Sequence, residues 1–198
     1  MYWYQKDVET IEAKPVKDTG EQKVVFYGSS SFTLWSNLEE LFPNYNVVNL
    51  AFGGSTLAAC AWFFKRIVPQ HQPQAIFLYA GDNDISDGRT PEEVVLFFLQ
   101  LLAEIRQLLG NIPVCYIAIK LSPTRKHLKG SIEFANNCIK SYVNDNPDNL
   151  HFLDLYTSML DAKGKIKKDL YQPDGLHLSV KGYALWYKEI EKKLLTML

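Results

Sequence analysis

The sequence predicts an α/β fold, a three-layer doubly wound sandwich built on a five-stranded parallel sheet. Five apolar, β-branched or aromatic runs of strand length recur along the chain, and most are apolar at both odd and even positions. Continuous apolar runs of this kind are typical of parallel strands that helices cover on both faces. Segments with helical patterning lie between the runs, so strands and helices alternate. This alternation predicts right-handed crossover connections.

In chain order, the predicted strands are residues 24–27 (VVFY), 47–50 (VVNL), 75–79 (AIFLY), 114–119 (VCYIAI) and 150–153 (LHFL). The predicted helices are residues 34–41, 57–68, 91–109, 131–143 and 180–195. Helix 91–109 has the clearest boundaries, because Thr90 can cap it, Pro91 suits its first turn and Gly110 follows its last apolar position. Its apolar run over 94–102 is too short, and too closely flanked by charges, to span a bilayer.

The bulk composition indicates one core and no charged partner. The 198 residues are 47% apolar and 22% charged, which suits a domain that folds without disulfides or a structural metal. A net charge of −1 gives no electrostatic footprint for nucleic acid. The cysteines, Cys60, Cys115 and Cys138, are odd in number and lack Cys-x-x-Cys spacing, so we expect buried reduced thiols and a cytoplasmic location. The opening residues lack a signal-peptide core, although a chain that has lost its leader would look the same.

The first 20 residues stand apart from the rest of the chain. An aromatic start over residues 1–4 precedes a charged stretch that ends at Gly20. We expect an N-terminal arm over 1–20 whose aromatic side chains pack on the domain surface. The alternatives are a contact in a homo-oligomer and a lid that faces the substrate. No repeat or linker divides residues 21–198, which we expect to form one domain.

Three polar or glycine-rich segments follow predicted strands. They are residues 28–31 (GSSS), 53–54 (GG) and 81–84 (GDND). In an open α/β sheet, ligands bind beyond the carboxyl ends of the strands, so these segments are predicted to share one rim. Each alone is also typical of ordinary caps and tight turns.

A fourth segment changes the interpretation of the other three. Asp174 precedes His177 by three positions across a glycine-containing turn, just before the last predicted helix. The carboxylate can hold one imidazole nitrogen and leave the other free to take a proton from a serine. With a serine, a glycine amide and an asparagine at the rim, the set is suited to nucleophilic attack on an acyl group. The other histidines, at positions 71, 127 and 151, lack such an acid and are predicted to be structural or on the surface.

These four segments resemble the conserved blocks of the SGNH, or GDSL-type, hydrolase superfamily of lipases and esterases. Residues 26–32 and 80–84 resemble its esterase branch, which is related to platelet-activating-factor acetylhydrolase subunits. The resemblance spans residues 24–195 and implies a flavodoxin-like sheet. It implies that Ser30 is the nucleophile, His177 the general base and Asp174 the residue that orients the histidine. The oxyanion hole would consist of the backbone N–H groups of Ser30 and Gly54 and the side-chain amide of Asn83.

The sequence departs from the family pattern at one position. The family usually has Gly-Asp-Ser at the nucleophile, whereas Ser29 stands where the aspartate would be. Because the other parts of the set are retained, we expect a variant active site. Three serines run together: the resemblance favours Ser30 as nucleophile, because it aligns with the family pattern through Gly28, while Ser29 is expected to brace the loop and Ser31 to cap the following helix. Catalytic silence caused by the change at position 29 is the alternative.

Asp82 and Asp84, on either side of Asn83, have no histidine nearby, so we expect them to brace or cap the loop and expect no metal. No phosphate-binding loop is present, and no cofactor is expected. The predicted function is a serine hydrolase that cleaves carboxylic esters of a small-molecule substrate, with short acyl groups on a small or sugar-like alcohol. Carbohydrate deacetylase, lysophospholipase and thioesterase activities are the alternatives among enzymes. The acyl pocket is expected among four apolar rim residues, although core packing is equally expected for the last two: Phe32, Trp35, Phe52 and Leu176.

Overall fold

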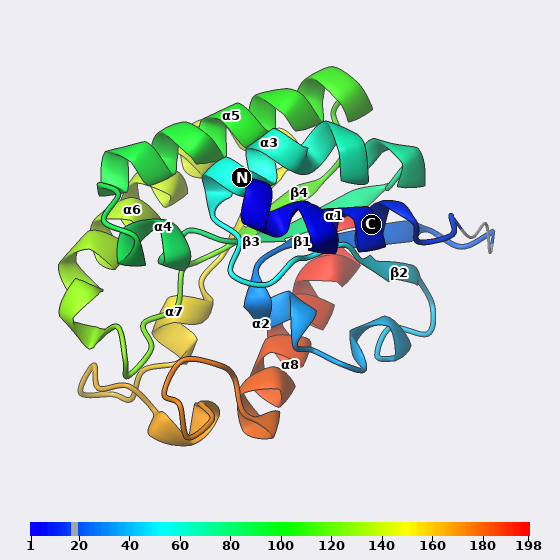
Figure 1. The fold of residues 1–198 in the computed structure, drawn as a ribbon. Coiled ribbons are helices and arrows are strands. Elements are labelled where there is room, and N and C mark those ends of the chain that lie inside the picture. Colours follow the sequence, from blue (N-terminus) through cyan, green and yellow to red (C-terminus); the bar gives the residue numbers. More distant parts are fainter. Residues whose placement is uncertain (17–19) are drawn as a thin grey trace.

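The computed structural model describes residues 1–16 and 20–198, and its centre is a five-stranded sheet with the order β2-β1-β3-β4-β5 (Figure 1). All four strand pairs are parallel. The strands are β1 (Lys23–Gly28), β2 (Asn46–Asn49), β3 (Ala75–Tyr79), β4 (Val114–Ile117) and β5 (Leu150–Leu153). The predicted fold is confirmed, and every strand lies within two residues of its predicted bounds. Residues 17–19, in the charged stretch of the predicted arm, lie outside the described residues.

Helices cover both faces of the sheet. One face packs against α1 (Gln5–Glu12), α3 (Leu57–Ile67), α5 (Pro91–Leu109) and α6 (Lys129–Asp145). The other packs against α2 (Ser30–Thr33), α7 (Leu155–Ser158) and α8 (Val180–Met197). Short elements complete the chain: η1 (Tyr2–Tyr4), η2 (Leu38–Glu40), η3 (Pro69–His71), α4 (Asp82–Ser86), η4 (Lys126–Leu128) and η5 (Lys168–Leu170). In the described residues, none of these helices has the length and apolar character needed to cross a membrane.

The two-sided packing explains why the strands are apolar at both parities. Successive side chains of β1 alternate between the faces, so Val25 and Tyr27 join the cluster beneath α3 while Val24 and Phe26 join the cluster beneath α8. The Phe26 ring stacks on Phe77 of the neighbouring strand, with ring centroids 5.1 Å apart. Both layers of the sandwich therefore depend on the continuous apolar runs seen in the sequence.

The predicted helix over 34–41 is wrong. Helical structure begins earlier, in α2, and Leu34 is already its C-cap. The backbone N–H groups of Trp35 and Leu38 donate to the carbonyl three residues back, which makes tight turns instead of an α-helix. Trp35 and Leu38 are buried, whereas Ser36 and Asn37 between them are exposed and belong to residue types that favour turns. Two consecutive tight turns thus produce an apolar spacing that looks helical.

The N-terminal residues pack on the sandwich. Tyr4, Val8 and Ile11 are buried, and α1 lies against α3. Arg66 of α3 forms an ion pair with Glu12, with Nε 2.7 Å from Oε1. Tyr4 also donates a hydrogen bond of 2.9 Å through its hydroxyl to the carbonyl of Gly54. The arm therefore contacts one of the glycine loops at the rim.

The cysteines are free thiols. Cys60 and Cys115 are buried as predicted, and burial raises the pKa of each to about 12. Cys138 is only half-buried, because it lies on the part of α6 that turns away from the core. The prediction of burial thus holds for two of the three.

Candidate active site

The three rim segments are joined by direct hydrogen bonds. Strand β1 lies between β2 and β3, so the loops that follow these strands are neighbours. Ser55, beside the glycine pair, donates through its hydroxyl to the carbonyl of Gly28 at 2.8 Å. Asn83 of α4 donates through Nδ2 to the carbonyl of Ser55 at 3.0 Å. The prediction of one shared rim is therefore confirmed.

The three adjacent serines have different environments. Ser29 has an extended backbone and is the N-cap of α2, with its Oγ accepting from the Ser30 N–H at 2.7 Å. Ser29 and Ser31 are each 1% exposed, whereas Ser30 is half-buried. The predicted cap role of Ser31 is wrong, because the residue is already inside the helix and Ser29 takes that role. Of the three hydroxyls, that of Ser30 is the one open to a substrate.

Gly28 sets the position of this turn. Its φ of 143° is rarely adopted by residues with a side chain, and a Cβ at this position would collide with the carbonyl oxygen of Tyr79. The absence of a side chain lets β1 run close against β3, where the Ser29 N–H donates to the Tyr79 carbonyl at 2.9 Å. The close approach brings the serine turn against the end of β3, near Asn83.

The three donors predicted for the oxyanion hole occupy the rim. The Asn83 amide donates through Nδ2 to Ser29 Oγ at 3.2 Å as well as to the Ser55 carbonyl. The Ser30 N–H donates to the same Ser29 oxygen, so two of the three donors converge on one atom. Gly54 is exposed at a φ of 69°, and its N–H makes no hydrogen bond among the described residues.

Asp174 and His177 form the predicted pair. His177 Nδ1 lies 2.7 Å from Asp174 Oδ2, and Asp174 Oδ1 accepts from the backbone N–H groups of Leu176 at 2.8 Å and His177 at 3.0 Å. The Leu176 N–H, followed by the histidine contacts, lowers the pKa of Asp174 to about 2. The carboxylate is therefore ionised at neutral pH and can hold Nδ1 in its protonated form, with Nε2 as the acceptor.

The loop after β4 connects this pair with the rest of the rim. Thr124 donates through Oγ1 to the Asp174 carbonyl at 2.7 Å, and its N–H donates to the Gly175 carbonyl at 3.1 Å. The next residue, Arg125, donates through Nη2 to Oδ1 of Asn83 at 2.8 Å. No hydrogen bond joins the Ser30 hydroxyl to His177 in the described part of the chain. The structure thus links the Asp174–His177 pair to Asn83 through residues 124 and 125.

The sequence matches the model of the GDSL-like Lipase/Acylhydrolase family over residues 23–185. The chain belongs to this family. The GDSL-like architecture is shared with solved structures: a candidate acylhydrolase of Bacteroides fragilis (TM-score 0.82, 22% identity, 97% of this chain and 95% of that one) and a GDSL-like lipase of Bacteroides thetaiotaomicron (0.81, 20%, 98% and 98%). A third, described as a candidate platelet activating factor from Streptococcus pneumonia, has a TM-score of 0.81 at 21% identity, over 98% of this chain and 95% of that one. No curated protein matches the sequence.

Membership confirms the resemblance seen in the four motifs, and the shared sheet confirms the SGNH hydrolase fold. At these identities the likeness to the solved structures concerns the fold. The family itself makes the protein an acylhydrolase of the GDSL type.

The acids that flank Asn83 in this GDSL-like acylhydrolase have different roles. Asp84 is buried and accepts from the Leu57 N–H at 2.8 Å through Oδ2, and burial raises its pKa to about 6. Asp84 thus binds the first N–H of α3, whose N-cap is Thr56, and joins its own loop to that helix. Asp82 instead forms ion pairs with Arg125 (2.8 Å) and Lys120 (3.4 Å). Burial alone would raise the pKa of Asp82, but the two cations outweigh that effect and hold it below the ordinary value.

The sequence interpretation missed Lys120 and Arg125. Both follow β4, whereas three of the four sequence motifs follow β1, β2 and β3 and the fourth directly precedes α8. The available signal in the sequence was the lysine directly after the apolar run 114–119, because a lysine at the end of a buried strand is rarely without a partner; in the structure Lys120 is buried. Among the described residues, no cluster of three or more histidine, cysteine, aspartate or glutamate side chains is arranged to hold a metal ion.

The four rim residues expected around the acyl group differ in whether they are buried in the core or line a pocket. Phe32 and Phe52 are fully buried in the core, so they do not line a pocket, and Leu176 is half-buried beside His177. Trp35 does line a groove, where its ring packs against that of Tyr183 of α8 with the ring centroids 4.9 Å apart. The aromatic residues nearest β1 and β2 are thus part of the core.

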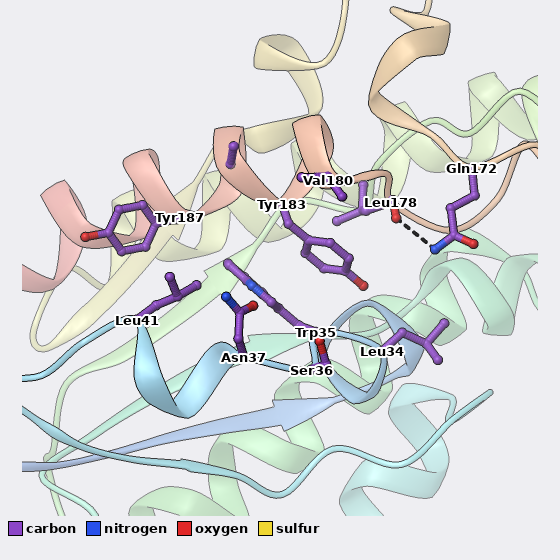
Figure 2. A pocket seen from close by; sticks show the side chains of 11 residues that line it. Leu34, Trp35, Ser36, Asn37, Leu41, Gln172, Leu178, Val180, Tyr183 and Tyr187 are labelled. Atoms are coloured by element: carbon purple, nitrogen blue, oxygen red, sulfur yellow. Dashed lines mark hydrogen bonds between the residues drawn. The ribbon is translucent and has the colours of Figure 1, made fainter.

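The groove beside Trp35 has a volume of about 640 Å³ and lies between the turns after α2 and the first half of α8 (Figure 2). It begins next to the candidate catalytic residues: the Leu34 N–H donates to the Ser30 carbonyl, and the Gln172 N–H donates to the His177 carbonyl. None of its lining residues is charged: Leu34, Trp35, Ser36, Asn37, Leu41, Gln172, Leu178, Val180, Tyr183, Ala184 and Tyr187.

Proposed function

We propose that this GDSL-like acylhydrolase is a serine esterase that cleaves carboxylic esters through an acyl-enzyme. Ser30 is the nucleophile, His177 the general base, and Asp174 the residue that orients the base and stabilises its charged form. The observation that carries the proposal is the 2.7 Å contact between His177 Nδ1 and an ionised Asp174. It is supported by the access of solvent to Ser30, since the neighbouring hydroxyls are buried.

In the acylation step, Ser30 Oγ attacks the ester carbonyl carbon while His177 Nε2 takes the serine proton. The carbonyl oxygen becomes an oxyanion that accepts hydrogen bonds from the backbone N–H groups of Ser30 and Gly54 and from Asn83 Nδ2. His177 then passes the proton to the departing alcohol oxygen as the carbon–oxygen bond breaks. Water attacks the acyl-enzyme by the same sequence and releases the acid and the free serine.

The substrate we propose has a short acyl group on a small or sugar-like alcohol. The support is the groove of Figure 2, whose lining combines the aromatic rings of Trp35, Tyr183 and Tyr187 with the neutral polar groups of Asn37 and Gln172. A neutral lining with a few hydrogen-bonding groups suits an uncharged, hydroxyl-bearing alcohol. It offers no partner for the charged head group of a lysophospholipid.

One observation favours the alternative of a catalytically silent binding domain. Ser29 Oγ already accepts from the Ser30 N–H and from Asn83 Nδ2, so an oxyanion must replace it as their acceptor. If that exchange is too costly, the rim binds a ligand without turning it over.

A fluorophosphonate probe, which reacts with activated serines, separates the two functions. We expect labelling of the wild type, none in Ser30→Ala, and retained labelling in the matched variant Ser31→Ala. A folded wild type that is not labelled would support the binding domain. Labelling that is lost in Ser31→Ala and kept in Ser30→Ala would refute the nucleophile assignment. Hydrolysis rates from acetyl to dodecanoyl esters test the acyl length, and a steady rise with chain length would contradict short acyl groups.

A further inference from the structure

Arg125 joins the oxyanion side of the rim to a buried charge cluster. Its Nη2 donates to Asn83 Oδ1 at 2.8 Å, while its Nη1 lies 2.8 Å from Asp82 Oδ2. The Arg125 side chain is 13% exposed, and those of Asp82 and Lys120 are 6% and 2% exposed. Lys120 also donates to the Tyr79 hydroxyl at 3.0 Å. The guanidinium is thus anchored on one side and presents its other arm to the asparagine.

Together with the Ser55 carbonyl, the Arg125 contact determines which way the Asn83 amide faces. An amide can turn by half a rotation and exchange its oxygen and its NH2 group. A turned Asn83 would place its NH2 group against the guanidinium donor and its oxygen against the Ser55 carbonyl, and both contacts would be repulsive. With Arg125 in place, Nδ2 faces the serine turn. A charged donor at Oδ1 also draws electron density from the amide and makes its N–H groups better donors.

The fork of an arginine is suited to this double contact. Two of its nitrogens reach two acceptors in fixed directions, whereas a lysine offers one nitrogen on a flexible stem. Lys120 already supplies a second positive charge to Asp82, so charge balance alone does not require the Arg125 contact with Asn83. The adjacent Thr124 donates a hydrogen bond to the turn that carries Asp174. One short loop after β4 therefore contacts both Asn83 and the Asp174–His177 turn.

We infer that Arg125 is a positioning residue, which fixes and polarises the Asn83 amide so that Nδ2 faces the carbonyl oxygen of the substrate. The inference rests on the proposed role of Asn83 as an oxyanion donor. Arg125 touches no reacting atom in this scheme and acts through the asparagine.

The test is a double-mutant cycle on kcat with 4-nitrophenyl acetate. Loss of one oxyanion donor reduces turnover by about 100- to 1,000-fold, which is our expectation for Asn83→Ala. We expect Arg125→Lys to reduce kcat by about 10- to 100-fold with little change in KM, and the double variant to be no slower than Asn83→Ala. Lys126→Met, which removes an exposed charge from the next position, is the matched control and keeps the kcat of the wild type. Losses that multiply in the double variant, or a wild-type kcat in Arg125→Lys, would overturn the inference.

A second measurement does not depend on turnover. In the Ser30→Ala protein, the Asn83 side-chain amide gives two proton resonances that report its hydrogen bonds. We expect Arg125→Lys to shift or broaden both resonances while the Lys126→Met spectrum is unchanged. If the resonances shift but the wild-type protein shows no hydrolysis that depends on Ser30, the proposed function is refuted and the positioning role of Arg125 is kept. Unshifted resonances would refute the positioning role, whether or not the esterase activity is found.

Discussion

Replacing Ser29 by alanine tests the role of the residue that stands where the family has an aspartate. The change removes an acceptor from the Ser30 N–H (2.7 Å) and from Asn83 Nδ2 (3.2 Å). It leaves Asn83 held by Ser55 and Arg125. The variant therefore separates a residue that stabilises the turn from one that takes part in the reaction.

The magnitude follows from the two contacts. Loss of an N-cap side chain costs about 0.5–2 kcal/mol, and loss of a second neutral hydrogen bond about 0.5–1.5 kcal/mol. We expect the free energy of unfolding to fall by about 2 kcal/mol. For a chain of this size, that fall corresponds to a decrease of about 4–8 °C in the melting temperature. Because Asn83 keeps its other partners, we expect kcat to stay within about tenfold of the wild type.

The assay combines calorimetric melting with kcat on 4-nitrophenyl acetate, and Ser86→Ala on the exposed side of α4 is the matched control. A kcat that falls by more than 100-fold at an unchanged melting temperature would refute this reasoning, because it would place Ser29 in the chemistry. An unchanged melting temperature together with unchanged kcat would also count against it, since the cap would then contribute nothing.

Three further perturbations have definite expected outcomes. Gly28→Ala places a methyl group against the carbonyl of β3 and should destabilise the protein by more than about 4 kcal/mol in urea unfolding, whereas Gly53→Ala, which points into open space, should change little. The carboxyl of Asp174 should titrate near pH 2 by carbon NMR. Its contribution to stability is therefore complete above its ordinary pKa and is lost as the pH falls towards 2. His177→Ala should raise the titration midpoint of Asp174 only in part, because the backbone N–H of Leu176 remains as a donor. Tyr4→Phe removes the hydrogen bond to the glycine loop after β2 and should lower stability by about 1 kcal/mol and kcat severalfold; wild-type values for both would show that the arm does not support that loop.

The sequence was sufficient for those parts of the structure that depend on local patterns. Strand β3 was predicted to the residue because AIFLY is uninterrupted and fully buried. The bounds of α5 were predictable because Thr90 suits a cap, Pro91 a first turn and Gly110 a helix end, and the structure adds a reciprocal capping box between Thr90 and Glu93. The helix predicted over residues 34–41 was wrong because burial of Trp35 against Tyr183 of α8, a residue far away in the sequence, outweighs the local helical spacing.

The candidate site shows the same division. The acid and histidine were predicted because they lie three residues apart and face each other across one turn. The contact between Arg125 and Asn83 spans 42 residues and depends on the β4 loop crossing to the end of β3, so no local pattern reports it. The cap role was assigned to Ser31 instead of Ser29 because the start of α2 depends on the backbone angles that Gly28 imposes.

The buried cluster of Lys120, Asp82 and Arg125 has a consequence for the history of the family. Removing Asp82 would leave the buried cations Lys120 and Arg125 without their carboxylate, which costs about 3–5 kcal/mol, whereas removing Arg125 leaves Asp82 paired with Lys120. Few single substitutions of Asp82 are therefore tolerated, and a lineage can change this residue only together with Arg125 or through a neutral intermediate. Relatives should then carry an aspartate at position 82 and an arginine at position 125 as a correlated pair. Where both are lost, other residues should hold the side chain of the asparagine. Such a pattern would divide the family by how the side-chain amide of this asparagine is held, independently of what each member cleaves.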